Sequence, residues 1–313
     1  MFMKGILHPL IFFTFCLILS ASVNGQKLTG SKLQTFLAKA SKKTAEYSAT
    51  FKNLTVEETK NFETFDENGR VKNSRKILSD LIIYEAENDK GNLAEYRNVR
   101  EVNGKKIKDS EIRTVKVFAQ LADAKSFADE LKKLNEEGSR YDKGLSFNGL
   151  ILFQAVPLHF NPASFKFDEI GREIIEGNEA VAVKFQQTAV DPNINLSVVV
   201  PDILEATNKF YRGIAWLDLK NHRILRLLTE VTFESPKFTE PFVVIKQEYF
   251  YQPGDFEIYL PRKIVSENFN PKIEKSAKLL LKTGKIKPVS QLQTRLTMEY
   301  KNFSKFDVTV KAN

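Results

Sequence analysis

Four runs of alternating apolar and polar residues follow one another between Lys209 and Phe269. They are rich in Val, Ile, Tyr, Phe and Trp, and the turn sequences Lys220-Asn221, Ser235-Pro236 and Pro253-Gly254-Asp255 lie between them. Strands that are joined by short polar turns form antiparallel meanders. The pattern therefore predicts a meander of four antiparallel strands, and none of its residues forms an evident catalytic group.

The N-terminal part of the chain predicts a helix laid on a second meander. Apolar residues recur at helical spacing between residues 26 and 51, and Ser31 is placed to cap that helix. From residue 50 onwards the pattern alternates, and turns at Asn68-Gly69, residues 88–91 and Asn103-Gly104 separate three or four strands.

Helical spacing returns between Asp109 and Tyr141, where Asp123 is placed to cap a second helix that Gly138 ends. The apolar segment LILFQAV, residues 150–156, predicts a short buried helix. Residues 164–190 predict a hairpin around Glu176-Gly177-Asn178, and two alternating runs close the chain. Because strands outnumber helices and the helices cluster early, we expect an α+β fold with one large antiparallel sheet.

The domain organisation follows from the absence of an internal repeat or a linker in the sequence. We expect one domain over residues 26–313, with an N-terminal helix and meander in residues 26–145 and a C-terminal meander in residues 146–313. Residues 1–25 have the pattern of a secretory signal peptide, because Lys4 precedes a short apolar run that ends in small and polar residues. Cleavage is expected after Gly25, with cleavage after Ser22 as the alternative.

The apolar run of that segment is shorter than the ~20 residues that a membrane-spanning helix needs, and no later run is long enough. The mature chain is therefore expected to be exported to the periplasm or the extracellular space, and to be soluble there. Cys16 is the only cysteine and lies within the predicted signal peptide, after Phe15 and not after the small residue that lipid attachment requires. The mature chain would thus have no disulfide, no reactive thiol and no cysteine metal site.

The charge of the chain bears on its partners. The formal net charge is +8, and it is spread along the chain. A basic surface in an exported protein favours anionic envelope surfaces or acidic ligands. Nucleic acid is not expected as a partner, because the compartment is wrong and no recognition motif is present.

Patterns for catalysis and metal binding are weak. After the predicted signal peptide only His159 and His222 remain of the 3 histidines, and no G-x-S-x-G or H-x-x-x-H pattern is present. We therefore expect a non-enzymatic protein without a metal or a cofactor. A hydrolase whose carboxylates come from separate strands remains open as an alternative.

A basic run between Lys272 and Lys287 is the sharpest local feature. One interpretation is contact with an anionic membrane surface, where each lysine contributes on the order of 1 kcal/mol. The other interpretation is a solvent-facing pair of strands whose lysines prevent edge-to-edge aggregation. The candidate membrane contacts are Lys275, Lys278, Lys282, Lys285 and Lys287.

Several segments resemble known exported proteins. Residues 52–188 are similar to a family of uncharacterised exported bacterial proteins, through LTVEET (54–59), RKILSDLIIYE (75–85), YRNVREVNGKKIKDSE (96–111), EEGSRYDKG (136–144) and GNEAVAVKF (177–185). Residues 213–231 and 247–269 resemble outer-membrane lipoprotein-carrier (LolA-like) proteins, in which a strand with G-x-x-W-x-D precedes a turn and the next hairpin. The resemblance implies an open half-barrel, a strongly curved antiparallel sheet whose concave face is covered by helices.

Such a half-barrel leaves an apolar cleft under its helices, and apolar clefts are the default sites for small molecules. The period of two places three side chains of the strand 210–219 on one face, and we expect three more aromatic residues to face the same interior. The candidate ligand contacts are Phe185, Phe210, Ile214, Trp216, Phe233 and Tyr249, with core packing as the alternative role of each.

The expected function is binding of an acyl chain, a lipid or a lipoprotein-like hydrophobic ligand in the cell envelope, by a protein that acts as a monomer. Each buried methylene of such a ligand contributes about 0.8 kcal/mol wherever it lies, which would explain the lack of a conspicuous polar motif. The alternative is a structural or interaction protein of the envelope whose cleft is filled by its own side chains.

Overall fold

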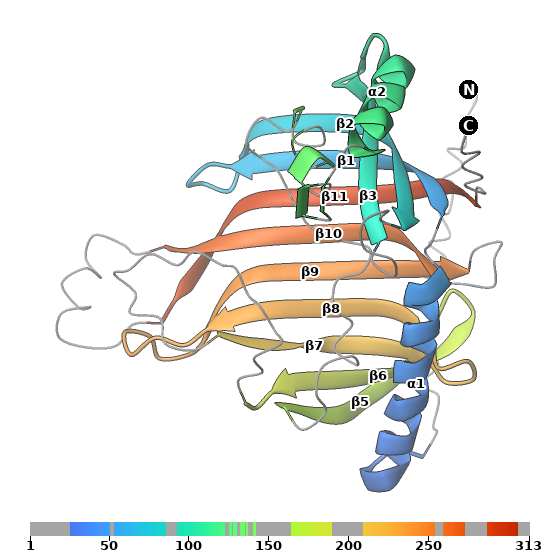
Figure 1. Ribbon diagram of the computed structural model, residues 1–313. Coiled ribbons are helices and arrows are strands. Elements are labelled where there is room, and N and C mark those ends of the chain that lie inside the picture. The colour runs from blue at the N-terminus through green and yellow to red at the C-terminus, as the bar shows by residue number, and fades with distance from the viewer. Residues whose placement is uncertain are drawn as a thin grey trace, which may run out of the picture.

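The strands of the chain pair into one antiparallel sheet, which contains 11 strands among the described residues, in the order β4-β3-β2-β1-β11-β10-β9-β8-β7-β6-β5 (Figure 1). The computed structural model describes residues 26–50, 53–85, 93–122, 164–189, 209–253, 259–272 and 287–305, and some positions between 125 and 141. The sheet is open, because its end strands β4 and β5 do not pair with each other. Its strong curvature makes β3 run in front of β1 and β11 in Figure 1.

Two groups of consecutive strands make up the sheet, and β1 joins them by pairing with β11. The N-terminal group is β1 (Leu54–Phe65), β2 (Val71–Glu85), β3 (Leu93–Val102) and β4 (Lys105–Lys106). The C-terminal group is β5 (Phe165–Ile175), β6 (Asn178–Gln187), β7 (Lys209–Asp218), β8 (Ile224–Phe233), β9 (Phe242–Pro253), β10 (Tyr259–Lys272) and β11 (Val289–Lys305). The predicted four-strand meander is confirmed as β7 to β10.

Two of the hairpin turns depend on residues with positive φ. Glu176 (φ 47) and Gly177 (φ 83) turn the chain between β5 and β6, and Asn103 (φ 50) and Gly104 (φ 75) turn it between β3 and β4. Two successive residues with positive φ form a type I′ turn, whose twist matches that of the strands it joins. Both turns lie where the sequence predicts them.

The two faces of the sheet differ in chemistry. The register places Leu227, Tyr249 and Ile264 side by side on one face, which we call the core face because the largest buried cluster lies on it. The opposite face, the outer face, carries ion pairs between neighbouring strands, such as Arg212 with Glu230 (Nε to Oε2, 2.7 Å). The alternation of apolar and polar residues along the strands produces this difference.

Helix α1 (Gly30–Thr50) packs on the core face through Leu33, Phe36, Leu37 and Ala40. The centroid of the Phe36 ring lies 5.1 Å from that of His222, in the turn between β7 and β8. Figure 1 shows that α1 crosses the ends of β5 to β9. This helix therefore covers one end of the core face.

Helix α2 (Ser110–Ala122) packs on the outer face of β2 and β3. The Phe118 ring meets Tyr96 and Tyr84 edge-on, with centroids 5.4 and 5.5 Å apart. Tyr96 pairs with Ile82 in the register, whereas the neighbouring Ile83 belongs to the core face. The expected cover of helices over the concave face is thus not confirmed by α2, and α1 supplies only part of it.

Other predicted helices are described in part or not at all. Between Asp123 and Gly138 the structure describes helical residues at 128–129, 132–134 and 136. The predicted buried helix of residues 150–156 and the predicted signal peptide of residues 1–25 lie outside the described residues. The subdivision at residues 145 and 146 stays a prediction.

Candidate functional site

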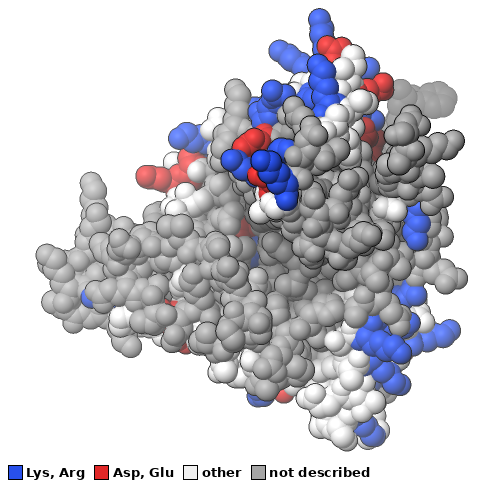
Figure 2. Space-filling view, in the orientation of Figure 1, with Lys and Arg blue, Asp and Glu red and all other residues white. Residues whose placement is uncertain are grey.

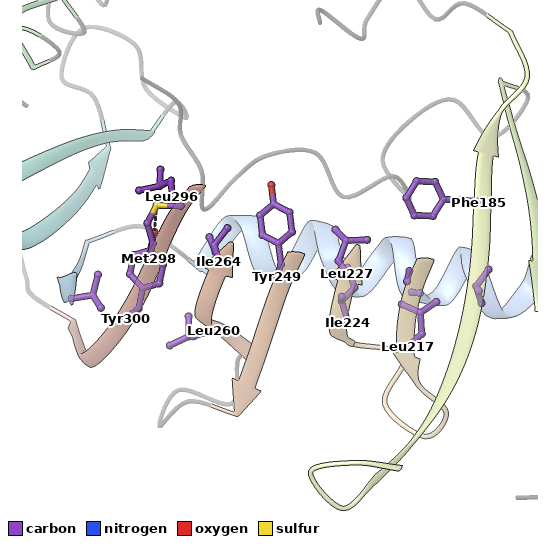
Figure 3. Close-up of a cluster of buried hydrophobic side chains, with 14 of the residues drawn as sticks. Phe185, Leu217, Ile224, Leu227, Tyr249, Leu260, Ile264, Leu296, Met298 and Tyr300 are labelled. Carbon is purple, nitrogen blue, oxygen red and sulfur yellow. Dashed lines mark hydrogen bonds between the residues drawn. The ribbon is translucent and has the colours of Figure 1, made fainter. Parts of the chain in front are cut away.

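A continuous row of apolar side chains crosses the core face from β11 to β6. Neighbouring strands contribute directly opposed residues, and every member of the row is almost fully buried. Figure 3 shows four of these side chains, together with others of the same cluster, side by side along the sheet. The row consists of Met298, Ile264, Tyr249, Leu227, Ala215 and Val183.

A strip of polar side chains runs beside this row, two residues away along each strand. It contains Ser266, Gln247 and Thr229, which lie opposite one another on β10, β9 and β8. Tyr249 donates a hydrogen bond to Gln247 Oε1 (3.2 Å), and Gln247 Nε2 donates one to Ser266 Oγ (3.4 Å). Burial raises the pKa of the Tyr249 hydroxyl well above its usual value, so this hydroxyl stays protonated. The strip thus brings neutral donors and acceptors into an otherwise apolar face.

At the β7 end of the strip a glycine makes room for an aromatic ring. Gly213 lies opposite Phe185 in the register. A Cβ atom at Gly213 would lie 2.5 Å from Phe185 Cζ and 1.9 Å from the Leu228 backbone oxygen. The Phe185 ring therefore occupies the space that any larger residue at position 213 would need.

A buried cluster of charged residues lies at the other end of the core face, on β1 and β3. Arg97 donates to both oxygens of Glu58 (2.8 and 3.3 Å) and to Glu95 Oε2 (2.9 Å). Ser79 Oγ donates to Glu58 Oε1 (3.3 Å), and the Lys60 ammonium lies 5.7 Å from the Phe62 ring centroid. We call Glu58, Lys60, Glu95 and Arg97 the charged cluster. The side chains of Glu58, Glu95 and Arg97 are at most 13% exposed.

The pKa values of the two carboxyl groups in the charged cluster are shifted in opposite directions. Burial alone would raise the pKa of Glu58, but the charges of Arg97 and Lys60 outweigh burial and hold that pKa below its usual value. Burial raises the pKa of Glu95, and Arg97 offsets this only in part. Burial would lower the pKa of Arg97, yet the two carboxylates raise it, so the guanidinium stays charged.

One atom of the charged cluster has no partner. Glu95 Oε1 is buried, and no described residue donates a hydrogen bond to it. A buried polar atom without a partner costs free energy, which a hydrogen-bonding group on a ligand would recover. Oε1 of Glu95 is therefore the atom of the charged cluster that could form a hydrogen bond with a polar group of a ligand.

Our interpretation of the sequence missed the charged cluster, although β1 contains a signal for it. Residues 54, 56, 58, 60 and 62 are Leu, Val, Glu, Lys and Phe, so Glu58 and Lys60 fall in phase with apolar residues. Charged residues on the apolar phase of a strand are placed for burial, where they need partners. The partner Arg97 could not be read from the sequence, because it lies two strands away in the sheet.

The structure does not bring the six predicted ligand contacts together. Phe185 and Tyr249 lie on the core face, as expected. Trp216 and Ile214 are on the outer face, in a cluster with Ala180, Ala182 and Leu225.

The Arg226 guanidinium carbon lies 4.4 Å from the Trp216 ring centroid, where a cation–π contact forms. Phe210 is half-buried and shares the outer-face phase of β7 with Trp216. Phe233 shares the core-face phase of β8 with Leu227, but it packs in a separate cluster with Phe238 and Phe242. The expected common interior for these side chains is therefore not what the register produces, because the period of two relates positions within one strand and does not say which face of a neighbouring strand they match.

Of the predicted membrane contacts, only Lys287 lies within the described residues. Its ammonium is 3.5 Å from Glu240 Oε1, and both side chains are largely exposed. Lys275, Lys278, Lys282 and Lys285 lie outside the described residues, so their role stays a prediction.

Within the described ranges, no three His, Cys, Asp or Glu side chains gather as they would around a metal ion. Across the same part of the chain, none of the helices has the length and apolar character needed to cross a bilayer.

Comparison with known proteins adds a likeness in structure. No protein-family model and no curated protein matches the sequence. Among solved structures, the chain is similar to a domain described as an outer membrane lipoprotein-sorting protein from Vibrio parahaemolyticus, with 11% identity, 89% of this chain and 95% of that chain covered, and a TM-score of 0.37.

A LolA superfamily protein from Nitrosomonas europaea has 11% identity, with 92% of this chain and 97% of that one covered, and a TM-score of 0.32. Lipoprotein LppX from Mycobacterium tuberculosis has 9% identity, with 89% and 99% covered, and a TM-score of 0.25. Proteins described as LolA-like or lipoprotein-sorting are thus among the solved structures to which the chain is similar.

Proposed function

We propose that this protein is exported to the periplasm or the extracellular space, and that it binds an acyl chain, a lipid or a lipoprotein-like hydrophobic ligand on the core face of its sheet. It acts without catalysis, as a soluble monomer. The observation that carries the proposal is the uninterrupted apolar row from β11 to β6.

The length of the row supports a chain-like ligand. Six neighbouring strands at ~4.8 Å each span roughly 24 Å. One leaflet of a bilayer has an apolar depth of about 15 Å, which is half of the ~30 Å hydrocarbon core. An acyl chain laid across the strands would therefore fit within the row, and each methylene would contribute about 0.8 kcal/mol.

The charged cluster supports a ligand with a polar end. It lies on β1 and β3, beyond the β11 end of the apolar row. Glu95 Oε1 supplies an acceptor for the hydroxyl hydrogen of an acid or alcohol group at the end of a chain. Such an arrangement would orient the ligand, with its chain toward β6 and its polar end toward β3.

A specific observation also favours a second function. The side chains of the apolar row are buried in this structure, with exposed fractions between 0% and 3%. A filled interior of this kind is what a structural or interaction protein of the envelope would have. Under the first function, the row must become accessible to the ligand.

Native mass spectrometry of the protein purified from its own cell envelope distinguishes the two functions. A stoichiometric lipid that persists in Trp216→Ala, whose altered side chain lies on the outer face, would support binding on the core face. Loss of the lipid in Trp216→Ala would move the site to the outer face. A protein mass without lipid, unchanged after incubation with envelope lipids, would refute ligand binding and favour the second function.

A further inference from the structure

Helix α2 exposes apolar side chains on the side that faces away from the sheet. Ile112 is 56% exposed and Val115 is 71% exposed, whereas Val117 is buried against β3. Ile112 and Val115 are three residues apart, so they are neighbours on one side of the helix. Large apolar residues with this much exposure, paired on one surface, mark contact surfaces more often than isolated ones do.

Four lysines lie close to this pair in the sequence. Lys105 and Lys106 form β4, Lys108 precedes the helix, and Lys116 lies one turn after Ile112, and all four are exposed. None of them forms an ion pair with a described residue. The acids nearby are Glu101, which lies opposite Lys106 in the register, Asp109 and Glu111. Figure 2 shows Lys and Arg side chains gathered at this end of the molecule, with some Asp and Glu among them. We call Ile112, Val115 and the four lysines the α2 tip.

The α2 tip is held firmly to the sheet. Arg113 donates to the Val99 backbone oxygen (3.0 Å) and to the Tyr141 hydroxyl (2.7 Å). The hydroxyls of Tyr96 and Thr114 lie 3.2 Å apart, and Thr114 also donates to the Ser110 backbone oxygen (3.0 Å). Because these contacts fix the helix, the exposed pair faces solvent in a defined orientation and needs no rearrangement to meet a surface.

From these observations we infer that the α2 tip docks the protein on an anionic phospholipid bilayer, with Ile112 and Val115 in the headgroup boundary and the lysines against the lipid phosphates. Apolar side chains ringed by lysines are the composition of interfacial membrane helices. Lysines near an anionic leaflet are attracted to its negative surface potential. The inference goes beyond ligand binding, and it would stand if the interior proved to be filled.

The size of the apolar surface favours a membrane over a protein partner. A stable protein interface buries about 800 Å² on each side around an apolar centre. Two exposed side chains among lysines offer far less than that, and interface centres are depleted of lysine. A bilayer needs only a few inserted apolar groups together with a positive charge, which is what the α2 tip provides.

Sedimentation of the mature protein with vesicles tests the inference. We expect binding to vesicles that contain phosphatidylglycerol and little binding to pure phosphatidylcholine. Replacing Lys105, Lys106 and Lys108 by Gln should weaken binding to the anionic vesicles by about a hundredfold. Ile112→Ser with Val115→Ser should also weaken it, and these exposed positions leave the core intact.

The matched control removes the same charge elsewhere. Lys32, Lys39 and Lys42 are exposed on α1, and their replacement by Gln should leave most of the vesicle affinity. Equal losses for the two triple variants would overturn the inference, because they would show a general charge effect. Absence of binding to anionic vesicles, or binding unchanged in the α2 tip variants, would overturn it as well. Circular dichroism of each variant confirms that folding is retained.

Discussion

Replacing Arg97 by Met removes the cation that serves two buried carboxyl groups. Glu58 is fully buried and Glu95 nearly so, and Arg97 bonds to both. Breaking a buried ion pair by removal of one partner leaves an uncompensated charge, which costs about 3–5 kcal/mol. Since domains of this kind are stable by about 5–15 kcal/mol, Arg97→Met should lose a large part of that stability.

The matched control is Arg212→Met on the outer face. Arg212 forms an ion pair with Glu230 at 2.7 Å, close to the 2.8 Å between Arg97 and Glu58, but both side chains are partly exposed. Exposed pairs of this kind contribute ~0–1 kcal/mol. Urea unfolding followed by the fluorescence of the single tryptophan, Trp216, measures both variants.

The pH dependence sharpens the test. In Arg97→Met the remaining carboxyl groups are easier to protonate, so the loss of stability should be largest at neutral pH and shrink as the pH falls. A triple variant with Leu at positions 58 and 95 as well should recover most of the loss, because an apolar replacement removes the unpaired charges. Equal effects of Arg97→Met and Arg212→Met would refute the buried cluster.

Three further variants have defined outcomes. In Gly213→Ala the new Cβ collides with a backbone oxygen and with Phe185, so urea unfolding should show a loss of at least ~1–3 kcal/mol, and an unchanged midpoint would contradict the register. The pKa of Glu95 is raised in the native state, so between about pH 4.5 and that raised pKa the native carboxyl group keeps its proton and the unfolded one does not. The free energy of unfolding of the wild type should therefore fall as the pH rises through this range. Glu95→Gln should abolish this pH dependence. Trp216→Ala should lose ~3–5 kcal/mol in urea unfolding followed by circular dichroism yet keep its lipid, and loss of lipid without loss of stability would contradict ligand binding on the core face.

Much of the sheet could be predicted from local signals. The turn residues Asn103-Gly104 and Glu176-Gly177 adopt positive φ in the structure, which is the property that makes them strong hairpin signals. Apolar alternation located β7 to β10, and helical spacing located α1. These features are set by residues close together in the sequence.

The faces of the sheet could not be predicted in the same way. The alternation of side chains along a strand tells which of its residues share a face. Which faces of neighbouring strands lie together depends on the register and on bulges, such as the register shift between Trp216 and Leu217. That is why Trp216 and Tyr249 were expected on one face and lie on opposite faces. The charged cluster escaped prediction for a related reason, since β2 separates Glu58 from Arg97.

Photo-cross-linking tests ligand binding on the core face most directly. Protein that lacks residues 1–25 is incubated with a fatty acid that carries a diazirine near the end of its chain, irradiated, and digested for peptide mapping. The account predicts adducts on core-face positions of neighbouring strands, such as Leu227, Tyr249 and Ile264. Adducts confined to outer-face positions such as Trp216 and Phe250, or the absence of saturable adducts, would contradict it.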